Sequence, residues 1–334
     1  MSLVRFLLCC ALLWAPLAQA REIHPGQRAL LKELAAETQA DHATRAAWKK
    51  LLDGAKYQQS IIDAISRPAE ATKPWRDYRK IFLTEQRLRD GITFWTEHRE
   101  LLDKVSTETG VPAEIIVAII GVETSYGRIT GKYKVIDALT TLALYYPPRA
   151  PFFRGELKQF LRLPGERFPI ATAEVTGSYA GAMGWGQFMP TSFAQWARDY
   201  DEDGVIDLWN SRPDIVASIA NYFVAHGWQK DMPVAERATA RDGAQPPELR
   251  ATETLHTVGK LAELGYTVAE PLDAALPATL LVLEGEQGSE HWITHQNFYV
   301  ISRYNRSPMY SLAVFQLSQQ LADGVRKAGK PAAP

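Results

Sequence analysis

The chain has 334 residues and a formal net charge of −1, with 37 Lys and Arg against 38 Asp and Glu. This near balance gives no electrostatic basis for binding nucleic acid or an anionic membrane surface. The length is ample for a large hydrophobic core and predicts two or three domains or lobes.

The first twenty residues have the features of a secretory signal. Arg5 supplies the positive charge, an apolar stretch runs over residues 6–17, and Ala18-Gln19-Ala20 is a small-residue cleavage site. The apolar stretch is too short for a membrane span. Cleavage after Ala20 would remove both cysteines, Cys9 and Cys10, so no disulfide is available afterwards. We therefore expect a soluble periplasmic protein of bacterial type with no transmembrane anchor.

Apolar residues recur at helical spacing through most of the chain. The segments that predict helices in the first half are 25–39, 43–55, 85–105, 111–127, 136–145 and 155–163. A proline-rich break at 147–151 precedes the last of them, and residues 164–178 predict a loop. Two further helices, 191–199 and 214–226, lie on either side of an Asp-rich turn.

The later part of the chain has a different character. Enrichment in β-branched and aromatic residues predicts strands over 279–284, 291–294 and 298–302. Residues 254–264 resemble a short helix that ends at Gly265. Helical periodicity returns over 307–327. We therefore predict a mainly α (α+β) fold with a small antiparallel β-containing domain.

The predicted domain organisation has five parts. They are a signal peptide (1–20), an N-terminal helical domain (21–105), a core with an EF-hand-like loop (106–230), a small β-containing domain (231–296) and a C-terminal segment that returns to the core (297–334).

Glu123 is the one carboxylate deep in a long apolar run. Pro112 suits the first turn of this helix, Gly127 suits its C-terminal cap, and Glu114 suits the positive end of the helix dipole. Because the helix is apolar nearly all round, we expect it to be buried, and burial would raise the pKa of Glu123. A carboxyl group that stays protonated near neutral pH suits an acid catalyst. The alternative is a buried Glu paired with an Arg or Lys.

Segment 177–190 combines four glycines with aromatic residues and one Gln. Glycine at this density lets the backbone approach a ligand or another element closely. Ser178 and Gln187 offer hydrogen bonds to sugar hydroxyls or an acetamido group, and Trp185 or Phe188 offers a face for ring stacking. The alternative is a tight corner of helix packing, and the spacing alone does not decide between the two.

Segment 199–207 matches the start of an EF-hand calcium loop. Asp stands at positions 1, 3, 5 and 9 and Gly at position 6, that is Asp199, Asp201, Asp203, Asp207 and Gly204. Position 7 offers the carbonyl of Val205. Position 12 is Asn210 in place of the usual Glu, and the nearest later carboxylate is Asp214. We expect a structural Ca²⁺ here, and the alternative is an Asp-Gly turn with scattered acids.

Tyr304, Asn305 and Tyr310 lie at the start of the last predicted helix. Tyr and Asn side chains can position a sugar or a catalytic acid. The alternative is a strand-to-helix turn capped by Ser307.

Together these segments resemble the lytic murein transglycosylases of the B type. The matching motifs are 121–124, 178–184 with 187–190, the loop from 199 with 208–209, 220–223 with 226–228, and 297–299 with 303–305. They occur in order over nearly all of the chain that follows the signal. One such motif is weak, whereas the ordered set is highly specific.

The resemblance implies a lysozyme-like core flanked by a helical domain and a small β-domain, with a long groove for peptidoglycan. It implies that Glu123 is the sole catalytic acid and base. By the same resemblance the groove residues are Ser178, Gln187, Tyr222, Tyr304, Asn305, Tyr310 and Arg149. The implied Ca²⁺ ligands are Asp199, Asp201, Asp203, the Val205 carbonyl and Asp214.

Two departures from the family pattern concern these residues. The family often has an Arg pair where this chain has Pro148 and Arg149, which reduces the expected contact with the peptide stem. The loop before Asp214 is one residue longer than in the best-known member, which makes Asp214 the least secure ligand. A lipoprotein signal would need a small residue just before the Cys and an apolar stretch upstream, whereas here Leu8 precedes Cys9 and only a few residues lie upstream. The missing lipid signal favours the soluble branch of the family.

The motifs near Glu123 offer Ser, Gln, Tyr and Asn but no evident second acid, whereas a hydrolase of this type needs two carboxylates. We therefore expect a lytic transglycosylase that needs no cofactor for its chemistry. Glu123 would act first as acid and then as base on the bond between N-acetylmuramic acid and N-acetylglucosamine, and would leave 1,6-anhydro ends. The alternatives are a lysozyme-type hydrolase and a non-catalytic peptidoglycan-binding scaffold. Glycan strands are the expected partner, and cell-wall synthases are further candidates.

Overall fold

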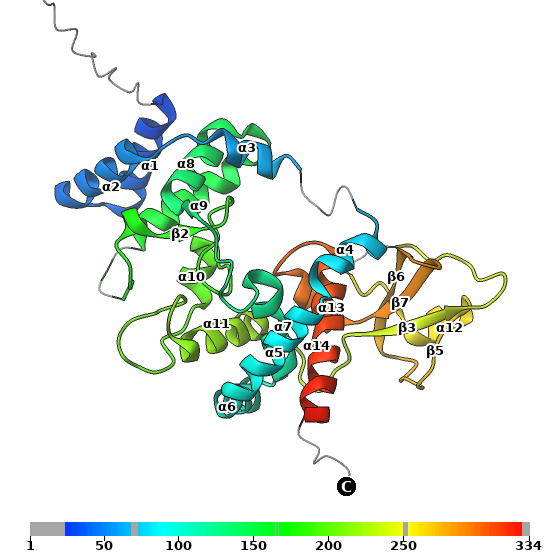
Figure 1. Cartoon of the computed structure of the whole chain (residues 1–334). Helices are drawn as coiled ribbons and strands as arrows, with labels where there is room; N and C mark the ends of the chain where they lie inside the picture. The colour runs from blue at the N-terminus through cyan, green and yellow to red at the C-terminus, as the bar shows by residue number, and fades with distance from the viewer. Residues whose placement is uncertain (1–23, 68–72, 164, 166, 250–252, 329–334) are drawn as a thin grey trace, which may run out of the picture.

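The computed structural model describes residues 24–67, 73–163, 165, 167–249 and 253–328. The predicted signal peptide lies outside the described residues. Within them the chain is mainly helical, with a five-stranded antiparallel sheet on one side of the molecule (Figure 1). The predicted fold class is therefore confirmed.

An N-terminal lobe combines two separate parts of the chain. Its helices are α1 (Pro25–Thr38), α2 (His42–Gly54), α3 (Gln59–Ile65), α8 (Val135–Tyr145) and α9 (Ala150–Arg162). The first three pack against the last two, and Figure 1 shows all five gathered at one end of the molecule. Glu33 and Glu37 on α1 form ion pairs with Arg154, Lys158 and Arg162 on α9. The packing therefore groups α8 and α9 with the start of the chain.

The central helices surround α7 (Ala113–Thr124), which is apolar all round and almost wholly buried. Its neighbours are α5 (Glu85–Glu97), α6 (Arg99–Thr109), α11 (Arg212–Ala225) and α14 (Pro308–Ala328). The remaining central helices are α4 (Trp75–Phe82), α10 (Pro190–Trp196) and α13 (Gln296–Ser302). Gly121 permits close packing on α7, since a Cβ there would lie 2.5 Å from the Tyr126 hydroxyl. An all-apolar helix in the centre of the core explains the sequence pattern of this segment.

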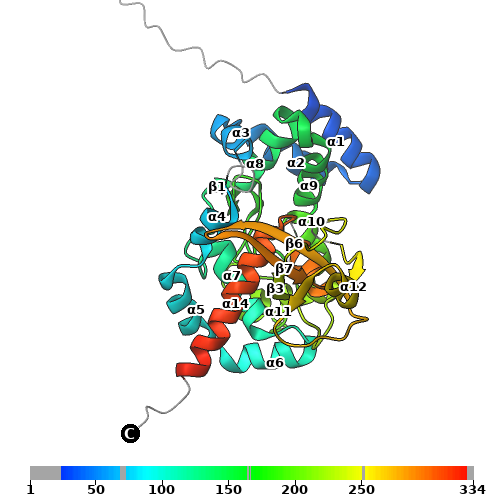
Figure 2. The same cartoon turned by 90° about the vertical axis from the view of Figure 1, so that its right-hand side faces the viewer.

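A five-stranded antiparallel sheet forms the third part, in the order β4-β6-β7-β3-β5. Its elements are β3 (Ala235–Ala240), β4 (His256–Thr257), α12 (Val258–Glu263), β5 (Tyr266–Val268), β6 (Pro277–Gly285) and β7 (Gly288–Thr294). Strands β6 and β7 form a hairpin that closes at the Gly285–Gly288 pair, where Gly288 has a φ of +111°. A separate small core, which includes Leu261, Tyr266 and Ile293, supports the sheet. Figure 2 views the molecule from the side of this sheet.

A second, two-stranded sheet pairs β1 (Tyr133–Lys134) with β2 (Thr176–Gly177). It joins the start of α8 to the glycine-rich segment. Short 3-10 helices at Pro147–Arg149 and Thr172–Glu174 occupy the loops before and after α9.

Two of the predicted elements were wrong. Residues 298–302 were expected to form a strand but form most of α13, because a short apolar run does not distinguish a strand from a buried helix. Segment 85–105 was expected to be one helix but forms α5 and α6, which separate at His98 with φ −114° and ψ 23°.

Asn297 ties the chain together where the sheet joins the core. Its side-chain nitrogen donates to the carbonyls of Gln229 and Met232 at 2.8 and 2.9 Å, and its oxygen accepts from the Gln229 amide at 2.8 Å. The side chain is fully buried. These three hydrogen bonds satisfy the buried amide group, so the fold itself explains why Asn stands at this position and no ligand is required.

No single helix among the described residues is long and apolar enough to cross a membrane. Helices α6 and α7 pass that test of length and composition only as a pair, bent by 114°.

Candidate active site

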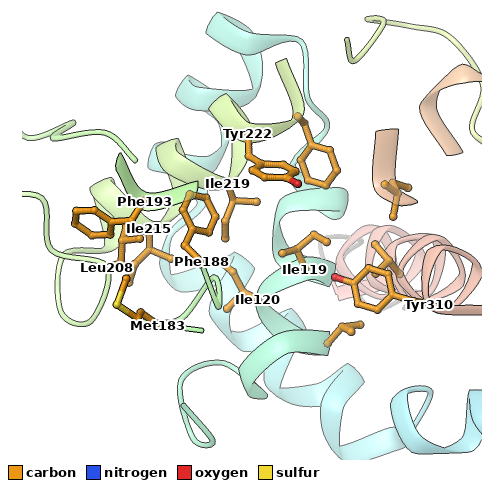
Figure 3. Close-up of a cluster of buried hydrophobic side chains, with 14 of the residues drawn as sticks. Ile119, Ile120, Met183, Phe188, Phe193, Leu208, Ile215, Ile219, Tyr222 and Tyr310 are labelled. Carbon is orange, nitrogen blue, oxygen red and sulfur yellow. The ribbon is translucent and has the colours of Figure 1, made fainter. Parts of the chain in front are cut away.

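Glu123 lies in the last turn of α7 and is half-buried. The hydroxyl of Tyr310, from the first turn of α14, donates to Glu123 Oε1 at 2.5 Å. Figure 3 shows the Tyr310 oxygen directed from α14 toward α7. Tyr310 is 3% exposed, so this contact fixes one oxygen of the carboxyl group from the interior of the protein.

Three rings form an aromatic cluster beside this carboxyl group: Phe188, Tyr222 and Tyr304. Their centroids are 4.7 to 6.0 Å apart, within the range of favourable ring contacts. The Tyr304 hydroxyl donates to the Gly186 carbonyl at 2.8 Å, and the Tyr222 hydroxyl donates to the Arg303 carbonyl at 2.6 Å. The cluster therefore joins α11, the glycine-rich segment and the loop before α14.

Burial keeps the phenol groups protonated. Desolvation is the main cause that raises the pKa of Tyr222 to about 12, and the negative charge of Glu123 adds to it. The same two causes raise the pKa values of Tyr304 and Tyr310 well above 10. Each phenol is therefore a neutral hydrogen-bond donor at neutral pH. The charge of Glu123 contributes to all three shifts, so its carboxyl group lies close enough to interact with each phenol.

The glycine-rich segment forms a compact turn against α7. Met183 and Phe188 exchange backbone hydrogen bonds at 2.9 Å. A Cβ at Gly184, where φ is +68°, would lie 2.6 Å from the Leu208 carbonyl oxygen. Close packing against Leu208 therefore accounts for the glycine at position 184, and no ligand is needed to explain it.

The polar side chains of that segment hold its backbone in place. Ser178 Oγ accepts from the amides of Ala180 and Ala182 at 3.3 and 3.1 Å. Gln187 Nε2 donates to the carbonyls of Thr130 and Gly184 at 3.2 and 2.9 Å. Both residues are half-buried, so each still presents part of its side chain to solvent.

The structure groups Tyr222, Tyr304 and Tyr310 around Glu123, with Ser178 and Gln187 on the adjoining segment. Asn305 is exposed, beside Tyr304 in the loop between α13 and α14. Arg149 is exposed in the N-terminal lobe, where its guanidinium lies 4.5 Å from the centre of the Phe152 ring. Arg149 therefore belongs to a different group of helices from α7, which carries Glu123.

The acidic loop between α10 and α11 forms a second polar site. Oxygen atoms of Asp199, Asp201 and Asp203 all lie within 4.8 Å of one another. Asp199 Oδ1 is buried and accepts no hydrogen bond, whereas Asp199 Oδ2 accepts from Arg167 and Gly204. A buried carboxylate oxygen without a partner, beside two further carboxylates, suits a hard cation such as Ca²⁺.

Asp214 lies outside that group of three. It is 1% exposed, and its two oxygens accept from the amides of Tyr200 and Asp207 at 2.7 and 2.8 Å. Burial is the main cause that raises its pKa. In the structure Asp214 closes the loop by joining its two ends through backbone hydrogen bonds.

The sequence interpretation overlooked Thr124, although it lies inside the 121–124 motif. Thr124 Oγ1 bonds the carbonyl of Trp185 at 3.1 Å, which connects the end of α7 to the glycine-rich segment. A Thr in the last turn of an otherwise apolar helix was the available signal.

A helical core that places the carboxyl group of Glu123 beside three tyrosines, with amide and hydroxyl groups along the adjoining turn, is typical of polysaccharide-cleaving enzymes of the lysozyme-like type. Residues 26–319 match the family described as Transglycosylase SLT domain. The chain belongs to this family.

Known proteins of the same kind resemble the chain over most of its length. It is 41% identical to the membrane-bound lytic murein transglycosylase B of Escherichia coli (strain K12) over 283 residues, which are 82% of this chain and 77% of the relative. The crystal structure of the soluble lytic transglycosylase SltB1 from Pseudomonas aeruginosa is 43% identical, with a TM-score of 0.83, and covers 92% of this chain and 100% of its own.

Two further solved structures contain bound groups. The Escherichia coli lytic transglycosylase Slt35 in complex with calcium is 37% identical, with a TM-score of 0.80 over 91% of this chain and 94% of its own. SltB3 from Pseudomonas aeruginosa in complex with NAG-NAM-pentapeptide is 29% identical, with a TM-score of 0.77 over 94% and 83%. The chain is an enzyme of the lytic transglycosylase class.

Proposed function

We propose that the protein cleaves the β-1,4 bond between N-acetylmuramic acid and N-acetylglucosamine in peptidoglycan and forms 1,6-anhydro ends. The observation that carries this proposal is the single carboxyl group, Glu123, held at 2.5 Å by the neutral Tyr310 phenol. The names of the relatives, which act on murein, support the same substrate.

The reaction uses Glu123 twice. Its protonated carboxyl group donates to the glycosidic oxygen while the bond from that oxygen to C1 of the muramic acid breaks, and the bonding electrons remain on the oxygen. The C6 hydroxyl of the same sugar then attacks C1. The Glu123 carboxylate accepts the proton of that hydroxyl, which closes the anhydro ring and restores the acid. No water enters the reaction.

The surrounding side chains would bind and orient the glycan. Ser178, Gln187 and Asn305 offer hydroxyl and amide groups for the ring and acetamido group, and Tyr222 and Tyr304 form the wall of the groove. Arg149 would meet the carboxylates of a peptide stem farther along the strand, since a guanidinium binds carboxylates well. Tyr310 would hold the carboxyl group of Glu123 in line with the bond to be cleaved.

A lysozyme-type hydrolase is the main alternative. Such an enzyme needs a second carboxylate about 5–5.5 Å or roughly 6.5–9.5 Å from the first. The motifs that adjoin Glu123 contribute Ser178, Gln187, Tyr304 and Asn305 but no carboxylate, which favours the transglycosylase. A non-catalytic scaffold would need no carboxyl group in this aromatic setting.

Digestion of purified sacculi followed by mass spectrometry tests the proposal. We expect muropeptides one water lighter than hydrolysis products, and hydrated ends alone would favour the hydrolase. Glu123→Gln should reduce the release by at least about 10³-fold, since a general acid typically contributes 10²–10⁴-fold and acts here in both steps. Glu114→Gln, on the same helix, is the matched control and should release products like the wild type. A folded Glu123→Gln protein with wild-type activity would refute the role of Glu123.

We also propose a structural Ca²⁺ in the acidic loop. Asp199, Asp201, Asp203 and the Val205 carbonyl would hold the ion, and it would neutralise their mutual repulsion without taking part in catalysis. The calcium bound by Slt35 supports this proposal. Asp214 stays a proposed ligand, and it can bind an ion only by sharing oxygens that already accept two amides.

The periplasm is the proposed location. The signal-like sequence of residues 1–20 and the occurrence of peptidoglycan outside the cytoplasmic membrane support this location. One relative is named soluble and another membrane-bound. N-terminal sequencing of protein from a periplasmic extract should start near Arg21, and a chain that starts at Met1 would contradict the location. Synthase partners stay a prediction.

A further inference from the structure

The two consecutive peptide groups on either side of Gly186 are each held by a side-chain hydroxyl. On one side Thr124 Oγ1 lies 3.1 Å from the Trp185 carbonyl oxygen. On the other side the Tyr304 hydroxyl donates to the Gly186 carbonyl at 2.8 Å. These two neighbouring peptide groups therefore connect α7 with the loop that precedes α14.

Thr124 directly follows Glu123 and is 1% exposed. Its hydroxyl can donate one hydrogen bond, and two carbonyl oxygens lie within reach, those of Ile120 at 3.2 Å and Trp185 at 3.1 Å. The Ile120 carbonyl already accepts from the Tyr126 amide. The Thr124 hydroxyl is the donor that the structure gives to the Trp185 carbonyl, so that carbonyl depends on Thr124.

The chain after Thr124 needs support of its own. Ser125, Tyr126 and Gly127 have φ values of +49°, +59° and +82°, a conformation that Ser and Tyr rarely adopt. Such backbone persists only where its surroundings fix it. The Thr124 hydroxyl accepts from the Gly127 amide at 3.1 Å and so closes this turn. One hydroxyl thus orders the turn and fastens it to the glycine-rich segment.

The glycine-rich segment is a rigid reference for this contact. Backbone hydrogen bonds between Met183 and Phe188 close its turn, and the Trp185 amide donates to the Leu208 carbonyl at 2.9 Å. A change at the Thr124 contact would therefore displace the last turn of α7 more readily than the segment. Glu123 is part of that last turn.

We propose that Thr124 is a positioning residue that sets the place of the Glu123 carboxyl group relative to the glycine-rich segment. Thr124 is buried and acts through Glu123, without touching the glycan. This inference rests on the proposed function, in which Glu123 transfers the proton. A purely structural hydroxyl would affect the stability of the fold and leave the rate of bond cleavage alone.

Three variants test the inference, assayed on a soluble peptide-free glycan tetrasaccharide of peptidoglycan. Thr124→Val keeps the branched shape and removes the hydroxyl, whereas Thr124→Ser keeps the hydroxyl. The matched control is Thr140→Val, because Thr140 is a buried threonine of α8 whose hydroxyl has no partner in the described structure. Thr124→Val should lower kcat about 10- to 100-fold, since a misplacement of about 1 Å costs up to 10²-fold. Its KM should stay within about twofold, because the groove is unchanged.

Thr124→Ser should recover kcat to within about threefold of the wild type, and Thr140→Val should match the wild type in kcat. Wild-type kcat in Thr124→Val, or a Ser variant as slow as the Val variant, would overturn the inference. If Thr124→Val does not fold by circular dichroism, Thr124→Ala replaces it, and failure of both to fold would make the hydroxyl a folding determinant and also overturn the inference. An active Glu123→Gln enzyme would instead refute the proposed function, whatever the Thr124 variants do.

Discussion

The core of this protein contains two sites built on carboxylates, and they differ in almost every physical respect. At the end of α7 a single carboxyl group is half-buried among phenol rings and accepts a hydrogen bond from Tyr310. In the loop between α10 and α11 three carboxylates lie within 4.8 Å of one another, and two of them are exposed. The hydrogen bond from the Trp185 amide to the Leu208 carbonyl connects the glycine-rich segment, beside the first site, with the chain that follows the acidic loop.

The difference shows how setting decides the role of a carboxylate. One acid that is half-buried beside neutral phenol groups is suited to exchange a proton with a substrate. Several acids held close together repel one another, and a cation relieves that repulsion. The same side-chain chemistry thus suits proton transfer in one place and ion binding in the other.

Among the tests of this comparison, we expect the largest effect from removing the hydrogen bond between Tyr310 and Glu123. Tyr310→Phe removes the hydroxyl and keeps the buried ring, so we expect kcat to fall about 10- to 100-fold through loss of alignment. The free energy of unfolding should fall by only about 1–2 kcal/mol, the range for one hydrogen bond to a carboxyl group. Rate measurements on the soluble glycan and urea denaturation give both values. A Phe variant with wild-type kcat would mean that the neutral donor is dispensable.

Calcium tests the other half of the comparison. Ca²⁺ added to chelator-treated protein should raise the melting temperature by roughly 5 °C at about 100 times its Kd. Asp199→Asn should abolish most of that rise, because Asp199 supplies the buried oxygen without a partner. The exposed Glu202, in the same loop but outside the group, provides the control variant Glu202→Gln, which should respond as the wild type does. A wild-type protein that calcium does not stabilise would leave the loop a simple turn.

His226 gives the smallest and most specific test, since its ring stacks on Tyr222 with centroids 4.0 Å apart. Desolvation is the main cause that lowers the pKa of His226 below its usual 6.5. As the pH falls below 6.5, His226 is therefore protonated in the unfolded chain before it is protonated in the folded chain. The free energy of unfolding decreases as the pH falls from 6.5 through the lower pKa of folded His226. His226→Phe should reduce the loss of unfolding free energy between pH 7.5 and 5.5. An unchanged loss would mean that the surroundings of His226 beside Tyr222 are not apolar enough to disfavour the protonated ring.

Local sequence patterns predicted the helix of Glu123 and the acidic loop, but not the contacts that surround them. The helix that carries Glu123 and the spacing of Asp199, Asp201 and Asp203 follow from local patterns, and the structure contains both. Local patterns suffice there because a buried helix and an acidic turn are each defined by consecutive residues. The roles assigned to these residues stay predictions.

What the sequence could not provide depends on contacts between distant segments. Residues 298–302 carry strand-like side chains, yet packing against α14 makes them a helix. The bond from Thr124 to Trp185 spans 61 positions of the chain, and no periodicity reports it. Asp214 shows the same limit, since its two backbone partners depend on how the loop closes.

The packing of α8 and α9 against α1, α2 and α3 has a consequence for dissecting this enzyme. The N-terminal lobe is assembled from two stretches, and α4 to α7 are inserted between them. A shortened protein that begins at α4 would leave the apolar faces of α8 and α9 open to water, and it should aggregate. The N-terminal lobe cannot be removed with a single cut of the chain. The enzyme therefore has to be shortened from the side of the β-sheet or kept whole.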